Sequence, residues 1–285
     1  MFGRKIRRRT VENVLAELKM LKEKNKIDGV YFLDDTFTVD KNWVLNLCQK
    51  MKSENLGLVW GCQTRTTTVN EELLIRMKEA GCVQVDFGVE SGSQRVLAGL
   101  KKGQTPKDIR IAFKLAHKVG LRAFATLMVG SPEEKMADIK KTEKLLKEIS
   151  PDYTHISFCT PLPGTELYEQ AQKKGWVDPS FGNNWDFFKT DLPIMAINFS
   201  PKEMVAIRAS LYNSLFLGNY RYFLEPRNIP FFLAVAWVVA FHPKELFKAF
   251  RRFLVTKNIV DLINAFLLIY HQSKMAHRVE KGNNS

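Results

Sequence analysis

The stretch of sequence with the clearest capacity for chemistry is an apolar run that ends in a carboxylate. Over residues 83–89, apolar side chains alternate with polar or small ones, which is typical of a β-strand. Glu90 follows, and residues 91–93, Ser-Gly-Ser, suit a turn whose amides and hydroxyls can contact a polar ligand. Loops at the carboxyl ends of strands carry function in repeating strand–helix folds, so this segment predicts a ligand site. An ordinary strand end with a solvated glutamate explains it equally well.

Polar side chains also follow four other apolar runs. In a fold built from parallel strands, the carboxyl ends of the strands lie at one edge of the sheet, so these side chains would converge there. Any one of these ends alone is consistent with an exposed loop, and only their repetition favours a ligand site. The four segments are Asp34-Asp35, Gln63-Thr64-Arg65, Gly130–Glu133 and Thr160-Pro161.

The elements that position these side chains alternate regularly between short apolar runs and longer amphipathic stretches. This alternation predicts the α/β class, with a parallel sheet and right-handed crossovers in a barrel or an open doubly wound arrangement. Thr10, Asn70 and Thr105 are suitable helix N-caps. Strands are predicted at residues 30–33, 58–60, 83–89, 123–129 and 153–159, and helices at residues 10–26, 41–53, 70–81, 105–120 and 139–149.

The cysteines and histidines form no recognisable metal or catalytic motif. The spacing of Cys48, Cys62, Cys82 and Cys159 does not suit a zinc or iron–sulfur ligand set and predicts reduced, mostly buried thiols in a cytoplasmic protein. Residues 88–92 match neither a phosphate-binding loop nor a dinucleotide fingerprint. Residue types alone therefore predict a polar ligand site without a metal, and they leave the reaction open.

Charge is unevenly distributed along the chain. The 285 residues are 45% hydrophobic and 26% charged, as in a globular protein, and the net charge is +13. Basic residues outnumber acidic ones roughly two to one in residues 1–30 and 200–285, whereas the stretch between them is nearly neutral. This distribution argues against a nucleic-acid-binding face spread over the middle of the chain, so we expect no nucleic acid there and anionic partners at the two ends.

The same patterns divide the chain into three parts. Residues 1–170 contain the strand–helix alternation, and residues 171–200, rich in aromatic residues and proline, predict an irregular segment that wraps over the core. Residues 201–285 are predicted to be helical, basic and apolar. This division places the ligand site in the first part.

Within the last part, residues 226–285 alternate between apolar and basic blocks. Residues 229–241 carry no charge but fall short of the roughly twenty residues that cross a bilayer, and a basic block at residues 244–257 follows. Such a segment suits two arrangements. One is a helical subdomain packed on the preceding part, and the other is peripheral contact with the anionic inner face of a membrane, which would suit a lipid-like substrate.

Six motifs, in order, resemble the core domain of radical S-adenosylmethionine enzymes, particularly the branch that often carries an upstream cobalamin-binding domain. The resemblance covers residues 4–170. It implies a partial (β/α) barrel of six strands, open on one side, that binds S-adenosylmethionine. The motifs are FLDDTF at 32–37, WGCQTR at 60–65, FGVESGS at 87–93, LKKG at 100–103, MVGSPEE at 128–134 and PGTELY at 163–168.

The resemblance assigns the methionyl end of this ligand to two groups of residues. Asp34, Asp35 and Thr36 match the motif that holds the methionyl amine. Lys102 is similar to the basic residue that pairs with the methionyl carboxylate, and Arg65 is a weaker match for the same role. A zwitterion requires both an anionic and a cationic partner, so the residue types agree with this assignment.

The adenosyl end is assigned in the same way. Glu90 and Ser91 resemble the position that contacts the ribose, whose hydroxyls need an acceptor. Gly130 matches the turn at which the backbone approaches the adenine. No catalytic residue is assigned by the resemblance.

The sequence departs from the family at its amino terminus. The family's first strand and its CxxxCxxC loop, which binds a 4Fe–4S cluster, are absent, and residues 3–7 resemble the segment just after that loop. We therefore expect a radical S-adenosylmethionine enzyme without its cluster-binding amino terminus, and an exposed sheet edge at residues 30–33.

The complete protein would perform a methyl transfer, a cyclisation or a similar radical step on a small-molecule or lipid-like substrate. Cobalamin, through an upstream domain, is left open as a further cofactor. Two alternatives remain. One is a non-catalytic barrel protein that binds a ligand or partner and has lost its cluster. The other is an unrelated α/β-barrel enzyme with Asp34 or Glu90 as acid or base.

Overall fold

The computed structural model describes residues 6–181 and 184–218, with some single positions between 233 and 251. The chain divides into two compact units, residues 1–204 and 205–285, and the first contains every described strand. Most of residues 226–285, including the apolar run and the basic block singled out in the sequence, lies outside the described residues. None of the helices that the structure describes combines the length and apolarity that a membrane crossing requires.

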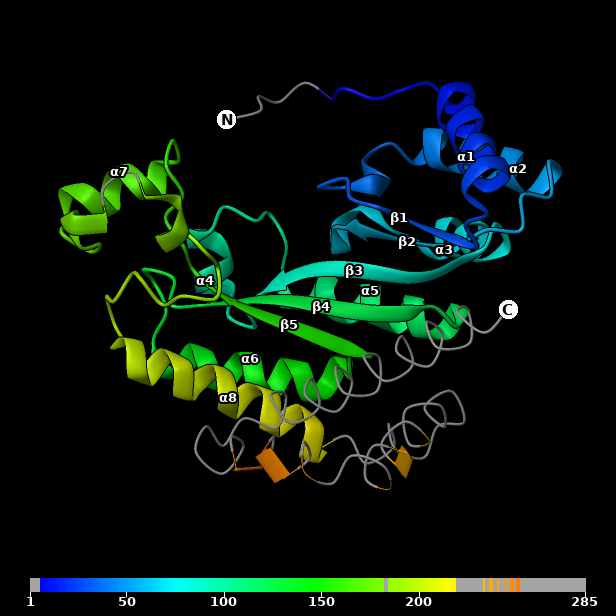
Figure 1. The fold of residues 1–285 in the computed structure, drawn as a ribbon. Coiled ribbons are helices and arrows are strands. Elements are labelled where there is room, and N and C mark those ends of the chain that lie inside the picture. Colours follow the sequence, from blue (N-terminus) through cyan, green and yellow to red (C-terminus); the bar gives the residue numbers. More distant parts are fainter. Residues whose placement is uncertain are drawn as a thin grey trace. The chain divides into compact units, whose positions relative to one another are not determined.

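A single sheet of five parallel strands forms the centre of the first unit (Figure 1). The strands lie in sequence order, each paired in parallel with the next, so every connection is a crossover. The predicted α/β class and the partial barrel are thereby confirmed. The strands are β1 (Gly29–Phe32), β2 (Val59–Thr64), β3 (Cys82–Glu90), β4 (Arg122–Val129) and β5 (Tyr153–Phe158).

The predicted helices are present, and their polar caps bind as expected. The side chains of Thr10, Asn70 and Thr105 each accept the backbone N–H three residues later, which satisfies an otherwise unpaired helix amide. These helices are α1 (Val11–Asn25), α2 (Lys41–Ser53), α3 (Glu71–Glu79), α5 (Pro106–Val119) and α6 (Met136–Ile149).

Two short helices and a longer one complete the described elements, with four single-turn 3₁₀ helices. The sequence did not predict α4 and α7, because six and eight residues hold too little periodic pattern to identify a helix. They are α4 (Gln94–Gly99), α7 (Glu166–Lys173) and α8 (Pro201–Gly218), with η1 (Phe37–Val39), η2 (Thr66–Thr68), η3 (Pro179–Phe181) and η4 (Trp185–Phe187).

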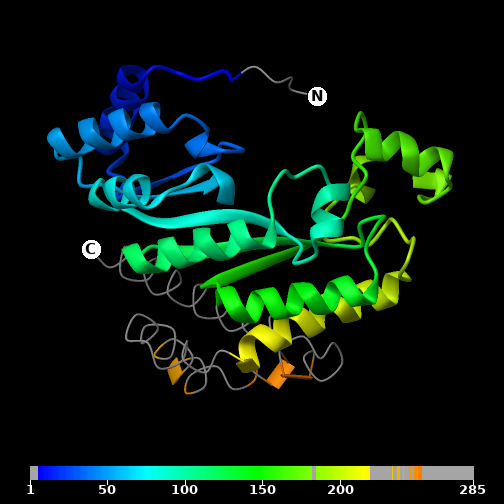
Figure 2. The ribbon, with the colours of Figure 1, turned by 180° about the vertical axis from the view of Figure 1, so that it is seen from behind.

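The two faces of the sheet differ sharply in polarity. On β3, Val85, Phe87 and Val89 are fully buried, and the ring of Phe87 packs against Phe113 of α5. Figure 2 shows α5 and α6 in front of β3, β4 and β5, covering this face. The residues between them on β3, from Gln84 to Glu90, are only half-buried and point to the opposite, open face. Polar side chains can therefore line the open face without disrupting the core.

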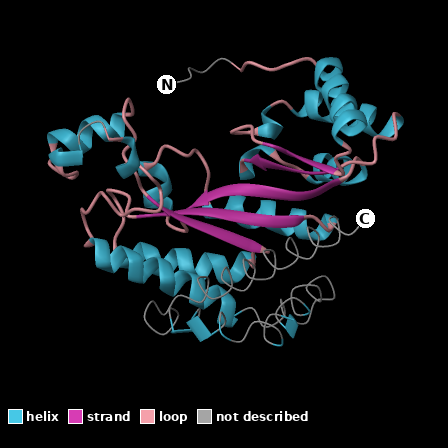
Figure 3. Cartoon of the chain, viewed as in Figure 1, coloured by secondary structure: helices cyan, strands magenta, loops and turns pink. Residues whose placement is uncertain are grey.

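Strand β1 forms one edge of the sheet (Figure 3). Among the described strands it pairs only with β2, and the side chain of Leu33 just beyond it is 78% exposed. The predicted exposed edge near residues 30–33 is therefore present in the described part of the chain.

The turn after β3 is bound tightly to α6. The backbone N–H of Gly92 and the hydroxyl of Ser91 both approach Thr142 Oγ1, at 2.9 and 3.2 Å, and Ser93 Oγ donates to Asp138 Oδ1 at 2.6 Å. The four side chains in this network are buried, and a buried polar group is stabilising only when it is hydrogen-bonded. The network fixes the path of the chain where β3 ends.

The stretch after α7 is irregular apart from η3 and η4, and part of it packs on the end of the sheet. Val177 and Met195 form a buried apolar cluster with Cys159 and Ala171. The Phe158 N–H of β5 donates to the Thr190 carbonyl at 2.7 Å. This segment thus covers the carboxyl end of β5.

Replacing Gly92 with alanine should destabilise the first unit. A Cβ at this position would lie 2.5 Å from the Lys141 carbonyl oxygen and 2.6 Å from Thr142 Cα, both backbone atoms of α6. Overpacking of this kind typically costs about 1–3 kcal/mol, measurable by urea unfolding. Gly103→Ala is the matched control, because nothing lies within 4 Å of its added Cβ and only the positive φ of 61° opposes the substitution. A Gly92 variant no less stable than the Gly103 variant would contradict the tight contact with α6.

Candidate functional site

A polar pocket of about 580 Å³ lies on the open face of the sheet, at the carboxyl ends of β1 to β4. It combines segments that are far apart in the sequence, so the ends of β1, β2 and β3 meet in one place. The other two predicted segments, Gly130–Glu133 after β4 and Thr160-Pro161 after β5, do not line this pocket. The lining residues are Asp35, Thr36, Gln63, Thr64, Arg65, Asp86, Gly88, Glu90, Leu100, Lys101, Lys102 and Thr126.

Glu90 is held in the pocket by an unusual backbone conformation. Its φ is +61°, in the left-handed region that non-glycine residues rarely adopt, and the pairing of β3 with β4 shifts register between Gly88 and Glu90. Such a conformation costs about 1–3 kcal/mol and persists only where the surroundings impose it. The result is a carboxylate turned back over β3, with Oε1 3.2 Å from the position that a Cβ on Gly88 would occupy.

Lys102 pairs with Glu90 across the pocket. Lys102 Nζ lies 2.7 Å from Glu90 Oε1, and the two side chains are 34% and 12% exposed, so solvent screens this pair less than a fully exposed pair. A C-terminal turn of α4 orients the lysine: the Lys102 N–H donates to the Leu97 carbonyl, and Lys101 adopts a φ of +54°. Arg65, at the end of β2, donates to the Lys102 carbonyl and ties this turn to the sheet.

Asp86 adds another carboxylate to the pocket lining. It lies on the same face of β3 as Gly88 and Glu90, and it accepts hydrogen bonds from the Tyr31 hydroxyl and from Gln84 Nε2, the latter at 2.9 Å. Burial raises the pKa of this carboxyl, although the two donors partly counteract the effect. Asp86 is thus a half-buried acid fixed in position.

Five of the residues assigned from the family resemblance line this pocket: Asp35, Thr36, Arg65, Glu90 and Lys102. The structure places the other three elsewhere. Asp34 is exposed beyond β1, outside the lining.

Ser91 and Gly130 have local partners instead. Ser91 is fully buried, and its hydroxyl contacts Thr142, so it supports the turn after β3. Gly130 has a φ of +90°, which favours glycine, and its N–H donates to Glu134 Oε2 at 2.7 Å. A Cβ at Gly130 would lie only 2.5 Å from the sulfur of Met204.

Sequence reasoning missed Asp86, Gly88 and Thr126 as lining residues, whereas Gln63 belongs to a strand-end segment that it singled out. A signal for Asp86 and Gly88 was present in the alternation of β3, which places residues 84, 86, 88 and 90 on one face. Lys101 was also missed, because the turn that brings it to the rim depends on α4.

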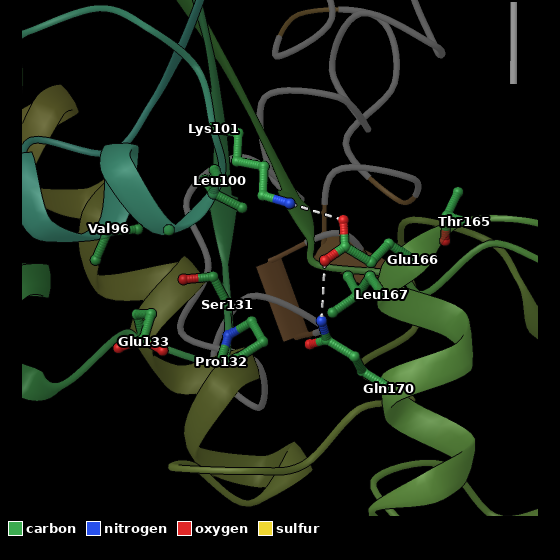
Figure 4. A pocket seen from close by; sticks show the side chains of 11 residues that line it. Val96, Leu100, Lys101, Ser131, Pro132, Glu133, Thr165, Glu166, Leu167 and Gln170 are labelled. Carbon is green, nitrogen blue, oxygen red and sulfur yellow. Dashed lines mark hydrogen bonds and ion pairs between the residues drawn. The ribbon is translucent and has the colours of Figure 1, made fainter.

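A second, smaller pocket of about 330 Å³ adjoins the first at Leu100 and Lys101. It lies between α4, the loop after β4 and the start of α7 (Figure 4). Lys101 Nζ reaches across to Glu166 Oε2 at 2.7 Å, and Gln170 donates to the same glutamate at 3.3 Å. Both charged side chains are mostly exposed, so this ion pair contributes little to stability.

The four cysteines do not form a cluster-binding site. All four are free and buried, and no group of three or more His, Cys, Asp or Glu side chains within the described residues is placed to hold a metal ion. Burial raises the pKa of the Cys48, Cys82 and Cys159 thiols to about 12, which disfavours the thiolate that binds iron. The residues described here therefore do not fit a 4Fe–4S cluster, whereas the charged pocket fits a small zwitterionic ligand.

The fold and the pocket define a class: a partial α/β barrel with a charged ligand pocket at the carboxyl ends of its strands. The family model of the Radical SAM superfamily matches residues 1–146, just over half of the chain. The chain therefore belongs to the Radical SAM superfamily, as the sequence motifs predicted. This family implies S-adenosylmethionine and a 4Fe–4S cluster as cofactors.

Curated relatives include an uncharacterised methyltransferase of Pyrococcus horikoshii, 35% identical over 76% of this chain and 47% of its own length. An anaerobic magnesium-protoporphyrin IX monomethyl ester cyclase of Rubrivivax gelatinosus is 26% identical over 61% of this chain and 32% of its own length. The chain thus spans less than half the length of these relatives.

Among solved structures, the radical S-adenosylmethionine methyltransferase TsrM of Kitasatospora setae, with cobalamin and a [4Fe-4S] cluster bound, shares the fold. Its TM-score is 0.57 at 17% identity, covering 78% of this chain and 47% of that one. At this identity the similarity concerns the fold alone, and it supports the partial-barrel assignment.

Glu134, which anchors Gly130, should make stability depend on pH. Burial raises the pKa of this carboxyl to about 7, and the Gly130 N–H only partly counteracts it. Because the folded pKa lies above the ordinary value of about 4.3, the contribution of Glu134 to stability is lost as the pH rises from about 4 through 7. The variant Glu134→Gln keeps an acceptor for Gly130 but cannot ionise.

Relative to the unmodified protein, this variant should therefore gain stability between pH 5 and pH 8, by at most about 1.4 kcal/mol per pH unit. Urea unfolding at both pH values measures the change. Glu133→Gln, the same substitution at the exposed neighbour, is the matched control. An equal stability difference at the two pH values would show that Glu134 ionises normally.

Proposed function

We propose that the pocket on the open face binds S-adenosylmethionine and that the chain is part of a radical S-adenosylmethionine enzyme. The observation that carries this proposal is the convergence of Asp35, Arg65, Glu90 and Lys102 in one pocket. These residues come from three strand ends and one helix end. They supply both signs of charge, which a zwitterionic ligand with a ribose requires.

Each end of the ligand has suitable partners in this arrangement. Asp35 and Thr36 would hold the methionyl amine, and Arg65 and Lys102 would hold the methionyl carboxylate. Glu90, fixed above Gly88, would accept hydrogen bonds from the ribose hydroxyls. Gly88 leaves room there, since a Cβ at this position would lie 3.2 Å from Glu90 Oε1 and 3.8 Å from Lys102 Nζ. When bound, S-adenosylmethionine supplies a methyl group or a 5′-deoxyadenosyl radical.

For the reaction we propose a methyl transfer or a cyclisation by the whole protein, on a small-molecule or lipid-like substrate. The methyltransferase and cyclase names among the relatives support these two classes. The cobalamin in the TsrM structure supports a cobalamin-assisted variant, in which a part of the protein beyond this chain would bind cobalamin. The alternative is a barrel protein that binds the cofactor without converting it. An assay of product formation distinguishes this protein from an enzyme.

We also propose peripheral contact of residues 226–285 with anionic membranes. The basic block at 244–257 supports it, since each lysine or arginine near such a surface contributes about 1 kcal/mol. Among the described positions of this segment, Leu233 and Phe247 are 65% and 64% exposed. Exposed apolar side chains beside basic ones suit the boundary between headgroups and acyl chains.

Binding of S-adenosylmethionine should weaken when either partner of the central ion pair is removed. Glu90→Ala and Lys102→Ala should each lose about 1.5–3 kcal/mol of binding free energy, because one charged hydrogen-bonding partner is lost and the other is left unpaired. Equilibrium dialysis with labelled S-adenosylmethionine measures both. Lys147→Ala, which removes a similar ion pair with Glu143 on α6, is the matched control. Unchanged affinity in both pocket variants would place the ligand elsewhere.

Liposome flotation should reveal the membrane contact. We expect the chain to float with vesicles that contain phosphatidylserine at low salt and to detach at high salt, because the attraction is electrostatic. A variant with Lys244, Lys248, Arg251 and Arg252 replaced by glutamine should stay in the dense fraction. Flotation that is equal for both proteins, or absent at low salt, would contradict this proposal.

A further inference from the structure

The charges of the pocket do not all have partners. The Glu90 carboxylate is paired with Lys102, and Lys101 is paired with Glu166. Three charged lining residues remain, Asp35, Asp86 and Arg65, and none of them has an ion-pair partner among the described residues. The part of the pocket that the structure describes is left with two negative charges and one positive charge uncompensated.

S-adenosylmethionine carries the complementary set. Its methionyl group has one ammonium and one carboxylate, and its sulfur is a positively charged sulfonium, which gives two positive charges and one negative charge. Arg65 suits the carboxylate, and Asp35, in the loop after β1, suits the ammonium. The charges that then remain are the sulfonium of the ligand and the carboxylate of Asp86 in the pocket. Complementary charges of this kind contribute chiefly to discrimination between ligands.

The position of Asp86 agrees with this match. Asp86 lies two residues before Gly88 on the same face of β3, a separation of about 7 Å along the strand. Because the Glu90 carboxylate folds back over Gly88, the two acids are neighbours on one line along the pocket. A ribose held by Glu90 has its 5′ carbon bonded directly to the sulfur, so the sulfonium must lie beside the ribose.

The carboxylate of Asp86 is also held in a fixed orientation that suits the binding of a cation. Tyr31 and Gln84 hold one carboxylate oxygen each, so the group is oriented before any ligand arrives. Its partial burial makes an uncompensated negative charge unfavourable, and a cation nearby would relieve that cost. Asp35 differs, because it lies in an exposed loop and its side chain accepts no such hydrogen bond from any residue that the structure describes.

We propose that Asp86 is the specificity-determining residue with which this pocket distinguishes the sulfonium of S-adenosylmethionine from the neutral thioether of S-adenosylhomocysteine. This inference rests on the proposed function, since it requires the ligand to bind in this pocket. It adds a residue to the site and gives it a separate role: Asp86 recognises a charge that disappears when the methyl group is transferred. The pocket would then release a demethylated product more readily than it releases the substrate.

The test compares the affinities of the two ligands by equilibrium dialysis on the full chain. For the unmodified protein we expect tighter binding of S-adenosylmethionine. In Asp86→Asn its affinity should fall about tenfold, the size expected for one lost charge interaction, while the affinity for S-adenosylhomocysteine changes less than about twofold. Asparagine has nearly the same shape and retains partners for Tyr31 and Gln84. A thermal unfolding midpoint near that of the unmodified protein verifies the fold.

Asp35→Asn is the matched control, because it makes the same chemical change at the other unpaired carboxylate. Both ligands carry the amine that Asp35 faces, so both affinities should fall together and their ratio should stay constant. A constant ratio in Asp86→Asn, or an equal change of ratio in both variants, would overturn the assignment of Asp86. If neither ligand binds the unmodified chain, the proposed function itself fails.

Discussion

The close contact between the turn after β3 and helix α6 determines the geometry of the pocket. Gly92 lies so near the α6 backbone that no larger residue fits, and the surrounding hydrogen bonds fix the chain on both sides of it. Because the turn cannot shift, Glu90 just before it keeps a positive φ that would otherwise be unfavourable. The position of the Glu90 carboxylate follows from this packing, while the C-terminal turn of α4 brings Lys102 to it.

The two faces of the sheet differ in polarity and in how far they are covered. Helices cover one face with fully buried apolar side chains, while the other face carries polar side chains that are only half-buried. Glycine at position 88 leaves a gap where a side chain would otherwise fill the pocket. A rigid apolar face and a polar open face on the same strands allow the protein to hold charged groups in fixed positions without exposing its core.

The Radical SAM superfamily implies two cofactors, and the described residues suit one of them better than the other. The charged pocket has the residue types and the space for S-adenosylmethionine. The four cysteines, by contrast, are buried thiols on separate elements and fit no cluster. The chain spans less than half the length of the methyltransferase and the cyclase that it matches, so the activity of the whole protein is a proposal that this part of it supports.

The sequence alone determined the class of fold, the strands and α-helices from α1 to β5 except α4, and the edge at which polar groups meet. It could do so because these features depend on local patterns: the period of two in β3, the caps at Thr10 and Thr105, and polar residues after each strand. It also pointed to Glu90 through the strand pattern, and to Lys102 through a family resemblance alone. Tertiary structure decided which candidates share a pocket.

Ser91 illustrates that limit. Glu90, its neighbour in sequence, lines the pocket, whereas the Ser91 hydroxyl is buried against α6. Asp86 illustrates the converse. Its value as a binding group depends on Tyr31 of β1, fifty-five positions earlier, and on the absence of an ion-pair partner among the described residues. Such properties arise from contacts between distant segments. A sequence pattern specifies the face on which a side chain lies, and only the packed structure specifies what that side chain meets there.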